Sequence, residues 1–222
     1  MSRSRLFTSA ALAAALLFFG RTPVRAQTTP PVPAPAQAAA NDLLDQRSKG
    51  SATAPIRVIE LSDFQCPWCR KFTVETSGIL DREYVATGKV RWIFVNLPIV
   101  QLHPNAGAAA ELAMCAAAQG KFWPMHDLLY RQQDAWAPLN QPEQYLLTLV
   151  DSLRIPRDSI LPCLRDARMR PLVQRDMNTA QRIGARSTPT FLVEGLLISG
   201  AYPVDVFRHV LDSIYTERTR TH

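Results

Sequence analysis

Ile56-Arg57-Val58-Ile59-Glu60-Leu61 is an apolar run that leads, through Asp63-Phe64-Gln65, into Cys66-Pro67-Trp68-Cys69. A strand that turns into a helix at Cys-x-x-Cys places the first sulfur beside the unpaired N–H groups of the helix start, where negative charge is favoured. Proline suits the first helical position, because no N–H donor is needed there. Both sulfurs then lie on one helical turn, close enough for a readily reduced disulfide. The stretch therefore indicates dithiol/disulfide exchange.

Cys-x-x-Cys also occurs as half of a zinc site, which needs a second close pair of Cys or His ligands. The remaining cysteines stand alone, and the histidines are scattered at His103, His126, His209 and His222. The spacing therefore predicts neither a bound metal nor another cofactor. We read His103 and His126 as ordinary helix or loop side chains.

Residues 1–26 have the pattern of a secretory signal peptide: Arg3 and Arg5, an apolar stretch over residues 6–20, and Val24-Arg25-Ala26 as a small-residue cleavage site. We therefore expect export to the periplasm, where disulfides persist. Residues 27–53 are expected to form a Pro/Ala-rich linker and N-terminal segment, with a short helix near Leu43-Leu44.

The formal net charge of +6 overstates the basic character of the mature chain. The signal holds four arginines and no acid, so cleavage reduces 25 basic residues to 21 against 19 acidic ones, or +2. This composition gives no support for a nucleic-acid partner. No later stretch approaches the roughly 18 to 20 apolar residues of a membrane helix, so we expect no membrane insertion of the mature chain.

Residues 56–61 and 90–97 read as parallel strands joined by the helix that Pro67 opens, which makes a right-handed βαβ unit. That helix is expected to run towards Gly78 or Gly88 with a bend near Thr76-Ser77-Gly78. Helical periodicity then covers residues 104–184. The expected helices of this part span residues 105–119, 122–132, 142–153, 156–165 and 171–183.

Residues 190–193 and 196–199 read as a hairpin with Glu194-Gly195 as its two-residue turn, and a helix follows from Pro203. The prediction is an α/β domain over residues 54–216, in which an all-helical insertion separates the βαβ unit from a final ββα unit. Residues 217–222 are expected to be a solvated tail.

This order resembles the thioredoxin fold and, with its helical insertion, the DsbA-like thiol:disulfide oxidoreductases. Three separated motifs carry the resemblance: Asp63-Phe64-Gln65-Cys66-Pro67-Trp68-Cys69, Gly120-Lys121-Phe122-Trp123 with His126-Asp127-Leu128-Leu129, and Gly184-Ala185-Arg186-Ser187-Thr188-Pro189-Thr190-Phe191. The resemblance implies that Pro189 is cis, faces the cysteine pair, and adjoins backbone at Thr188 that binds extended substrate peptide. The residues alone make Pro189 an ordinary proline at a strand start.

Glu60 matches the buried acid that members of this superfamily carry on the same strand. Flanked by Val58, Ile59 and Leu61, its carboxyl either points to solvent or is buried with a shifted pKa. In the second case we hypothesise that Glu60 relays a proton to or from Cys69.

Thiol chemistry assigns the roles of the pair. A substrate thiolate attacks Cys66 in the oxidised enzyme, so Cys66 is expected to be the exposed sulfur of low pKa and Cys69 the buried one. The type member of the family carries Pro-His between its cysteines, whereas Trp68 supplies no positive charge. Pro67 and Trp68 are expected to contact apolar substrate, although Trp68 shielding the helix turn is the alternative.

Cys115 and Cys163 both fall in the helical insertion. Cys115 shares a helical face with Ala108 and Leu112 and therefore points inward. We predict a structural Cys115–Cys163 disulfide, because exported proteins seldom keep buried thiols apart when geometry lets them pair. Two buried free cysteines are the alternative.

The leading hypothesis is an enzyme that introduces disulfides into reduced or unfolded exported proteins, working as a monomer. The resemblance adds a membrane quinone-linked partner that reoxidises the dithiol. Isomerase or reductase activity is the first alternative, although the residues between the signal and Ala54 are too few for the dimerisation domain of isomerases. A non-catalytic metal chaperone or redox sensor is the second, with no nearby Met or His set to bind copper.

Overall fold

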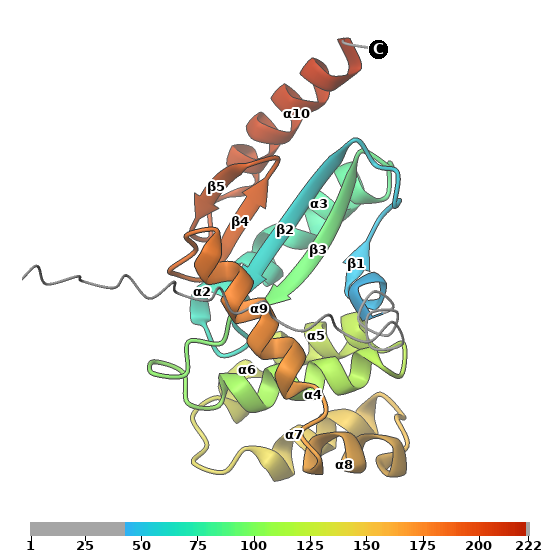
Figure 1. Cartoon of the computed structure of the whole chain (residues 1–222), viewed down its shortest axis with the longest axis vertical. Coiled ribbons are helices and arrows are strands. Elements are labelled where there is room, and N and C mark those ends of the chain that lie inside the picture. Colours follow the sequence, from blue (N-terminus) through green and yellow to red (C-terminus); the bar gives the residue numbers. More distant parts are fainter. Residues whose placement is uncertain (1–42, 221–222) are drawn as a thin grey trace, which may run out of the picture. The chain divides into compact units, whose positions relative to one another are not determined.

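The computed structural model describes residues 43–220. The predicted signal peptide, residues 27–42 of the predicted linker and the end of the predicted tail lie outside these residues. A five-stranded sheet has the order β1-β3-β2-β4-β5, in which β2 and β3 are parallel and the other neighbours are antiparallel (Figure 1). The strands are β1 (Ser48–Lys49), β2 (Ile56–Ser62), β3 (Val90–Asn96), β4 (Thr190–Val193) and β5 (Leu196–Ser199). The predicted βαβ and ββα units are both present.

The central strand β2 places Glu60 in the core of the domain. Ile56, Val58 and Leu61 are fully buried, because helices cover both faces of the sheet at this strand. Glu60 lies opposite Phe94 of β3 and Phe191 of β4 in the register. Its side chain is therefore surrounded by the sheet's own aromatic residues.

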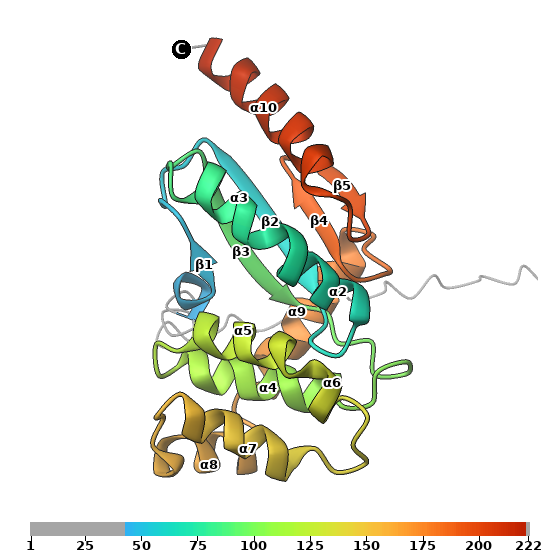
Figure 2. The same ribbon diagram turned by 180° about the vertical axis from the view of Figure 1, so that it is seen from behind.

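The helix that follows the cysteine motif is continuous but irregular. It comprises α2 (Pro67–Phe72), the π-helical turn η1 (Thr73–Ser77), α3 (Gly78–Leu80) and a second π-helical turn, η2 (Asp81–Val85). The stretch where a bend was predicted, Thr76-Ser77-Gly78, holds the end of the π-helical turn η1, a kind of turn that is frequent at functional sites. This helix and α10 (Val204–Arg220) cover one face of the sheet (Figure 2).

The aromatic rings of Phe72, Phe191 and Phe207 pack against one another between these helices and the sheet. Their centroids lie 4.5 to 5.3 Å apart, within the range of favourable edge and offset contacts. Phe72 comes from α2, Phe191 from β4 and Phe207 from α10. The contact therefore holds the start of the helix that bears Cys66 and Cys69 against the centre of the sheet.

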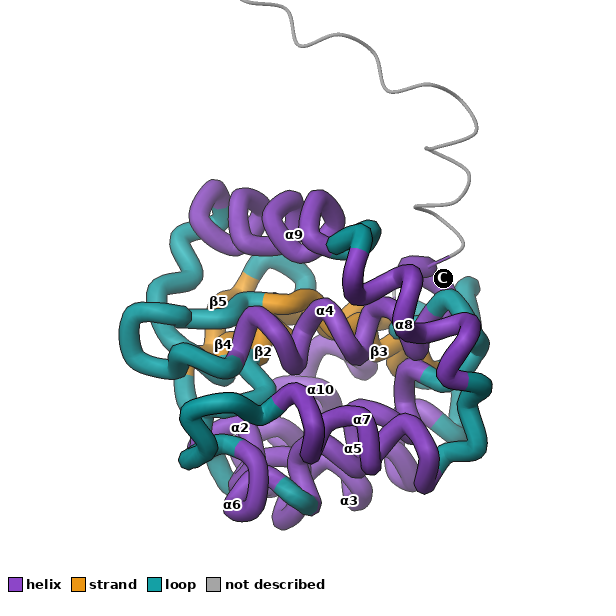
Figure 3. Tube along the Cα trace, turned by 90° about the horizontal axis from the view of Figure 1, so that it is seen from below, coloured by secondary structure: helices purple, strands orange, loops and turns teal. Residues whose placement is uncertain are grey.

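Helices form most of the segment between β3 and β4. They are α4 (Ala106–Ala117), α5 (Phe122–Arg131), α6 (Gln133–Trp136), α7 (Glu143–Ser152), α8 (Arg157–Arg165) and α9 (Arg170–Arg182). Five of them match the predicted ranges within a few residues, and the short α6 was not predicted. α4, α5, α7 and α8 lie beyond one end of the sheet (Figure 1), and in the view from that end α4 crosses in front of the strands (Figure 3). Within residues 43–220, no helix combines the length and the apolar character needed to cross a membrane.

The last helix of the insertion, α9, has a separate role. It covers the face of the sheet opposite α10 (Figure 1), where Ala180 and Ala185 pack with Leu61, Ile93 and Val95. Ala180 is the α9 residue of this cluster, and its small side chain lets the helix approach the sheet closely. The sheet is thereby covered on both faces, as the largely buried strand Ile56–Ser62 requires.

The fold begins earlier than Ala54, which corrects the predicted domain start. Residues 43–46 are helical, as predicted around Leu43, and β1 then pairs with β3. Between them, Arg47 is buried and its guanidinium donates to both carboxylate oxygens of Asp176 on α9. Asn96 also donates to Asp176, from its backbone N–H (3.1 Å) and its side-chain amide (2.9 Å). We call Arg47, Asn96 and Asp176 the N-terminal clasp; it ties residues 43–49 into the domain.

The last helix continues past the predicted C-terminal boundary at Thr216. Residues 217–220 continue α10 as exposed helix rather than starting a tail at Glu217. The Arg218 guanidinium donates to the Pro55 carbonyl (3.0 Å) and forms an ion pair with Glu194. These contacts join the C-terminal end of α10 to the loop before β2 and to the β4–β5 turn.

Candidate functional site

Cys66 is the residue before the first turn of α2. Its backbone is extended (φ −71°, ψ 124°), and Pro67 occupies the first turn, where a missing N–H costs nothing. Both cysteines are free thiols; Cys69 is fully buried, and Cys66 is only 3% exposed. Cys66 was expected to be exposed, and this expectation is wrong. The Thr188 segment covers its sulfur, which as a thiol donates to the Thr188 carbonyl oxygen at 3.4 Å.

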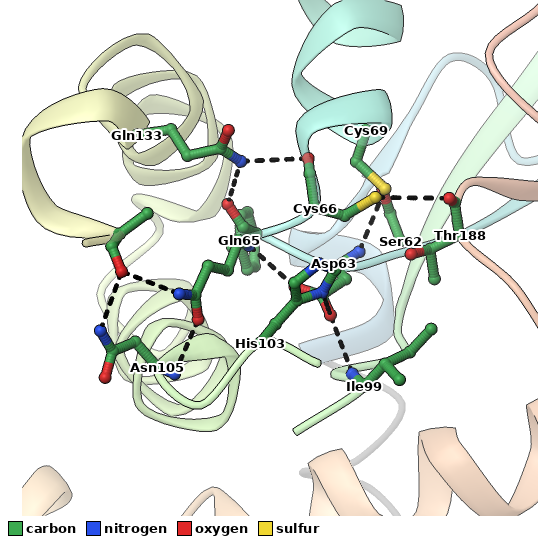
Figure 4. Close-up of polar contacts among 12 residues, drawn as sticks. Ser62, Asp63, Gln65, Cys66, Cys69, Ile99, His103, Asn105, Gln133 and Thr188 are labelled. Atoms are coloured by element: carbon green, nitrogen blue, oxygen red, sulfur yellow. Dashed lines mark hydrogen bonds and ion pairs between the residues drawn. The ribbon is translucent and has the colours of Figure 1, made fainter. Parts of the chain in front are cut away.

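The two thiols differ sharply in acidity. A hydrogen bond from the Cys69 thiol, supported by the backbone N–H groups of Cys69 and Trp68, lowers the pKa of Cys66 from 9.0 to about 6. Burial raises the pKa of Cys69 well above its usual range, and the neighbouring Cys66 raises it further. Figure 4 shows the two sulfurs side by side. At neutral pH the pair holds a Cys66 thiolate beside a Cys69 thiol, the arrangement that thiol exchange requires.

We expect the ultraviolet absorbance of the Cys66 thiolate to titrate with a midpoint of about 6 in the reduced protein. The lowered pKa means that the thiolate is lost as pH falls through that value, and alkylation slows with it. Because the pKa is lower in the folded protein, the thiolate stabilises the reduced fold. This contribution is complete above pH 9.0 and is lost as the pH falls from that value through about 6. Cys66→Ser is the control, and a midpoint near the ordinary thiol value of about 8.5 would contradict the expectation.

A cis peptide bond joins Thr188 to Pro189 beside the cysteines, as the resemblance implied. Thr188 also lines a groove of about 360 Å³ whose other lining residues are Trp68, Ser187, Ser199, Gly200, Ala201 and Tyr202. Trp68 is 60% exposed and Tyr202 44%, and no charged side chain lines the groove. An uncharged, partly aromatic depression thus adjoins Cys66.

Asp63 organises the loop in front of the cysteines (Figure 4), a role the sequence did not reveal. One carboxylate oxygen accepts hydrogen bonds from the Ile99 N–H and His103 Nδ1, and the other from the Gln65 N–H, all at 2.8 Å. The Asp63 N–H itself donates to Cys69 Sγ at 3.5 Å. Asp63 therefore supplies a donor to the sulfur that departs when the disulfide opens. Its place directly after the strand and before Cys-x-x-Cys was the available signal.

Amide side chains fix the same loop to the helical insertion. Gln133 Nε2 donates to the carbonyls of Phe64 (2.7 Å) and Cys66 (3.1 Å). Gln65 Oε1 accepts from the Asn105 N–H at 2.7 Å. These bonds satisfy the polar groups of a buried loop, which would otherwise carry a desolvation cost. No local sequence pattern predicts them, because the partners lie far apart in the chain.

Glu60 is buried, at 2% exposure, rather than facing solvent. Burial raises the pKa of its carboxyl, and the nearby His126, followed by the hydrogen bond from Trp92 Nε1 (2.9 Å), offsets part of that rise. Ser62 hydrogen-bonds to the Tyr130 hydroxyl at 2.9 Å and interacts with the Cys69 thiol. Ser62 therefore lowers the pKa of both Glu60 and Cys69, an influence that the sequence did not indicate.

The predicted structural disulfide lies apart from this centre. Cys115 of α4 and Cys163 of α8 form a disulfide with a Cα–Cα distance of 6.0 Å. His103 contacts Asp63, and His126 is buried on α5 with its Nδ1 2.9 Å from Asp127. Within the described part of the chain, no three His, Cys, Asp or Glu side chains gather as a metal site would require.

Comparison with known proteins decides the family. A family model described as Thioredoxin matches residues 43–213. The chain belongs to the thioredoxin family. Among solved structures, this thioredoxin-family protein is similar to α-DsbA1 of Wolbachia pipientis, with a TM-score of 0.72 and 21% identity over 79% of this chain and 93% of that one. The likeness confirms the thioredoxin fold with the helical insertion of DsbA proteins.

Two curated relatives differ in length. The probable disulfide bond formation protein D of Bacillus anthracis is 31% identical over 155 residues, which cover 68% of this chain and 71% of that protein. The Na(+)/H(+) antiporter NhaA 3 of Salinispora tropica is 33% identical over 167 residues, 75% of this chain but 24% of the antiporter. This family member thus spans about a quarter of the antiporter's length.

Proposed function

We propose that this protein is a thiol:disulfide oxidoreductase that introduces disulfide bonds into reduced or unfolded exported proteins. The observation that carries the proposal is the division of the Cys66–Cys69 pair into a thiol of lowered pKa and a buried thiol of raised pKa. A stabilised Cys66 thiolate favours the reduced enzyme, and its disulfide is correspondingly oxidising. The family and the relative named for disulfide bond formation support the same reaction.

The reaction starts from the Cys66–Cys69 disulfide. A substrate thiolate attacks Cys66 Sγ, the Cys66–Cys69 bond breaks, and Cys69 leaves as a thiolate that the Asp63 N–H can stabilise. Cys69 then takes a proton, for which Glu60 is the proposed source. A second substrate thiolate attacks the substrate sulfur of the mixed disulfide and releases Cys66 as a thiolate. The substrate loses two electrons to the enzyme disulfide.

The groove beside Cys66 is the proposed substrate site. Its uncharged lining, with Trp68 and Tyr202 exposed, suits apolar segments of unfolded chains rather than charged peptides. Pro67, Trp68, Thr188 and Pro189 are the proposed contacts on either side of Cys66. In this arrangement Trp68 receives substrate and does not merely shield the helix turn.

The redox potential tests the direction of the reaction. We expect equilibration with glutathione to place the Cys66–Cys69 couple above the roughly −270 mV of thioredoxin. A value at or below that level would indicate a reductase and contradict the oxidase assignment. In parallel, Cys69→Ser should accumulate mixed disulfides with unfolded exported proteins, because the second thiol that would release them is missing. Cys66→Ser is the matched control and should trap none.

The remaining proposals concern location and organisation. Residues 1–26 act as a cleaved export signal, residues 27–42 link it to the domain, and the mature protein works as a monomer in the periplasm. A quinone-linked membrane protein is the proposed acceptor of electrons from the reduced pair. Fractionation of cells that produce the full chain tests the location: recovery of uncleaved chain in the cytoplasm would refute it.

A further inference from the structure

The strand β5 forms an open edge of the sheet (Figure 1). It is the last strand in the order, so within residues 43–220 no strand pairs with its outer side. Leu196 is 51% exposed and Leu197 38%, and β5 contains no charged residue and no proline. Edge strands are usually short, charged or interrupted by proline, because they otherwise pair with other chains. β5 has none of these protections.

The opposite edge of the same sheet is protected. β1 has only two residues and ends with Lys49. The charge nearest to β5 in the sequence, Glu194, points away from the β5 edge: its carboxylate accepts from the Arg57 N–H of β2 at 2.8 Å and forms an ion pair with Arg218. The lack of protection is therefore specific to β5 and indicates a use for that edge.

The turn before β5 fixes how the strand pairs. Both turn residues, Glu194 and Gly195, have a positive φ (47° and 95°), as a two-residue hairpin loop of this kind requires. Val193 and Leu196 flank the turn and lie opposite each other. In such a hairpin the flanking residues exchange both N–H···O bonds. Leu196 therefore directs its N–H and C=O toward β4.

Alternation along the strand then shows which backbone groups face outward. Hydrogen-bonded pairs alternate with non-bonded pairs in an antiparallel ladder, so Ile198 also faces β4. Gly200 continues this series, because its N–H donates to the Pro189 carbonyl at 2.8 Å. The residues between them, Leu197 and Ser199, therefore direct their N–H and C=O away from the sheet.

This outward row leads into the groove beside Cys66. Ser199 lines the groove together with Trp68 and Thr188, and the Thr188 carbonyl lies 3.4 Å from Cys66 Sγ. Leu197 comes two residues before Ser199, roughly 7 Å away at the rise of a β-strand. A chain that fills the groove thus meets the free donors and acceptors of β5 within a few residues of its cysteine.

We propose that the outer edge of β5 is a second part of the substrate site, where an extended segment of an unfolded chain pairs through its backbone while its cysteine is bonded to Cys66. Backbone pairing is largely independent of sequence and suits an enzyme with many substrates. Leu196 and Leu197 lie on opposite faces of the strand and contact apolar side chains of the added segment. Continuity with the groove favours a substrate over a second copy of this chain. The inference rests on the proposed function, because it extends the groove assigned there.

Amide hydrogen exchange tests the pairing directly. In the Cys69→Ser protein, Cys66 is joined by a disulfide to an uncharged peptide with a central cysteine and about five residues on each side. We expect the Leu197 and Ser199 amides, followed by NMR, to exchange on the order of tenfold more slowly than in the same protein joined to glutathione, which is too short to pair. The Ile198 amide is the internal control, because it is bonded to β4 in both conjugates.

The possible outcomes separate this inference from the proposed function. Equal exchange of the Leu197 and Ser199 amides in the two conjugates overturns the inference and leaves the proposed function intact. Protection of these amides in the free protein that grows with its concentration would assign the edge to a second copy, and would also overturn the inference. If Cys66 forms no mixed disulfide with the peptide, the proposed function fails and the inference fails with it.

A substitution at the edge tests the role of the backbone donor. Leu197→Pro removes one outward N–H without breaking the β4–β5 ladder, since edge strands tolerate proline at such positions. Leu197→Thr is the matched control, because it changes the side chain but keeps the N–H. We expect kcat/KM for a long dithiol peptide, relative to that for dithiothreitol, to fall severalfold more in Leu197→Pro than in Leu197→Thr. Equal ratios in the two variants would overturn backbone pairing, and if Leu197→Pro does not fold, the exchange experiment decides alone.

Discussion

Replacement of Cys66 by serine is expected to reduce the rate of peptide oxidation by on the order of 10⁴-fold or more, since it removes the sulfur that substrate attacks. The remaining thiol cannot take over, because Cys69 is fully buried and its pKa is raised by that burial. Oxidation of a fluorescent dithiol peptide by the preoxidised protein measures the loss. The Cys115→Ala/Cys163→Ala double variant is the control and should retain activity.

A Cys66→Ser protein that still oxidises the peptide at an appreciable rate would contradict this assignment. Circular dichroism of the variant excludes unfolding as the cause of a loss. The comparison is sharp because Cys66 lies outside the aromatic cluster of Phe72, Phe191 and Phe207. Substitution of one sulfur by oxygen at the start of α2 should leave that cluster intact.

Removal of the Cys115–Cys163 disulfide is expected to lower the free energy of unfolding by about 4 kcal/mol, by the chain-entropy estimate. The bridge closes a loop with a sequence separation of 48 and joins α4 to α8, so its loss releases much of the helical insertion in the unfolded chain. Urea unfolding of the Cys115→Ala/Cys163→Ala variant under oxidising conditions measures the effect. Alanine avoids the burial of unpartnered hydroxyl groups.

The matched control is Cys66→Ala/Cys69→Ala. The disulfide that this variant cannot form closes only a short ring, so its loss changes the loop entropy of the unfolded chain little. An unchanged urea midpoint in the Cys115→Ala/Cys163→Ala variant would show that the insertion is held by packing alone. Unchanged titration of Cys66 in the same variant would show that the bridge is structural. The two cysteine pairs would then be independent, one for chemistry and one for stability.

Local patterns predicted those features that depend on neighbouring residues. Pro67 at a first turn, Glu194-Gly195 between two short apolar runs, and the helical periodicity of the insertion each carry their signal within a few residues. The hairpin strands Thr190–Val193 and Leu196–Ser199 match their predicted ranges for this reason. The cysteine motif belongs to the same class, and its chemistry could be predicted from its place at a strand-to-helix junction.

Features that depend on distant partners could not be predicted this way. β1 has two residues, and its pairing with Ile93 and Trp92 is invisible in its own sequence. His103 reaches Asp63 across 40 positions, and Gln133 reaches Cys66 across 67. The burial of Cys66 depends on the Thr188 carbonyl, which is 122 positions away. Only the folded chain brings these groups together.

The N-terminal clasp decides where this domain can be cut. A recombinant chain that started at Ala54 would lose Arg47 and leave the Asp176 carboxylate buried without its cation, a strongly destabilising situation. It would also expose the hydrogen-bonding edge of β3 that β1 now covers, an invitation to edge-to-edge aggregation. Expression of the isolated domain, or its grafting onto another protein, should therefore retain the residues from Leu43 onward.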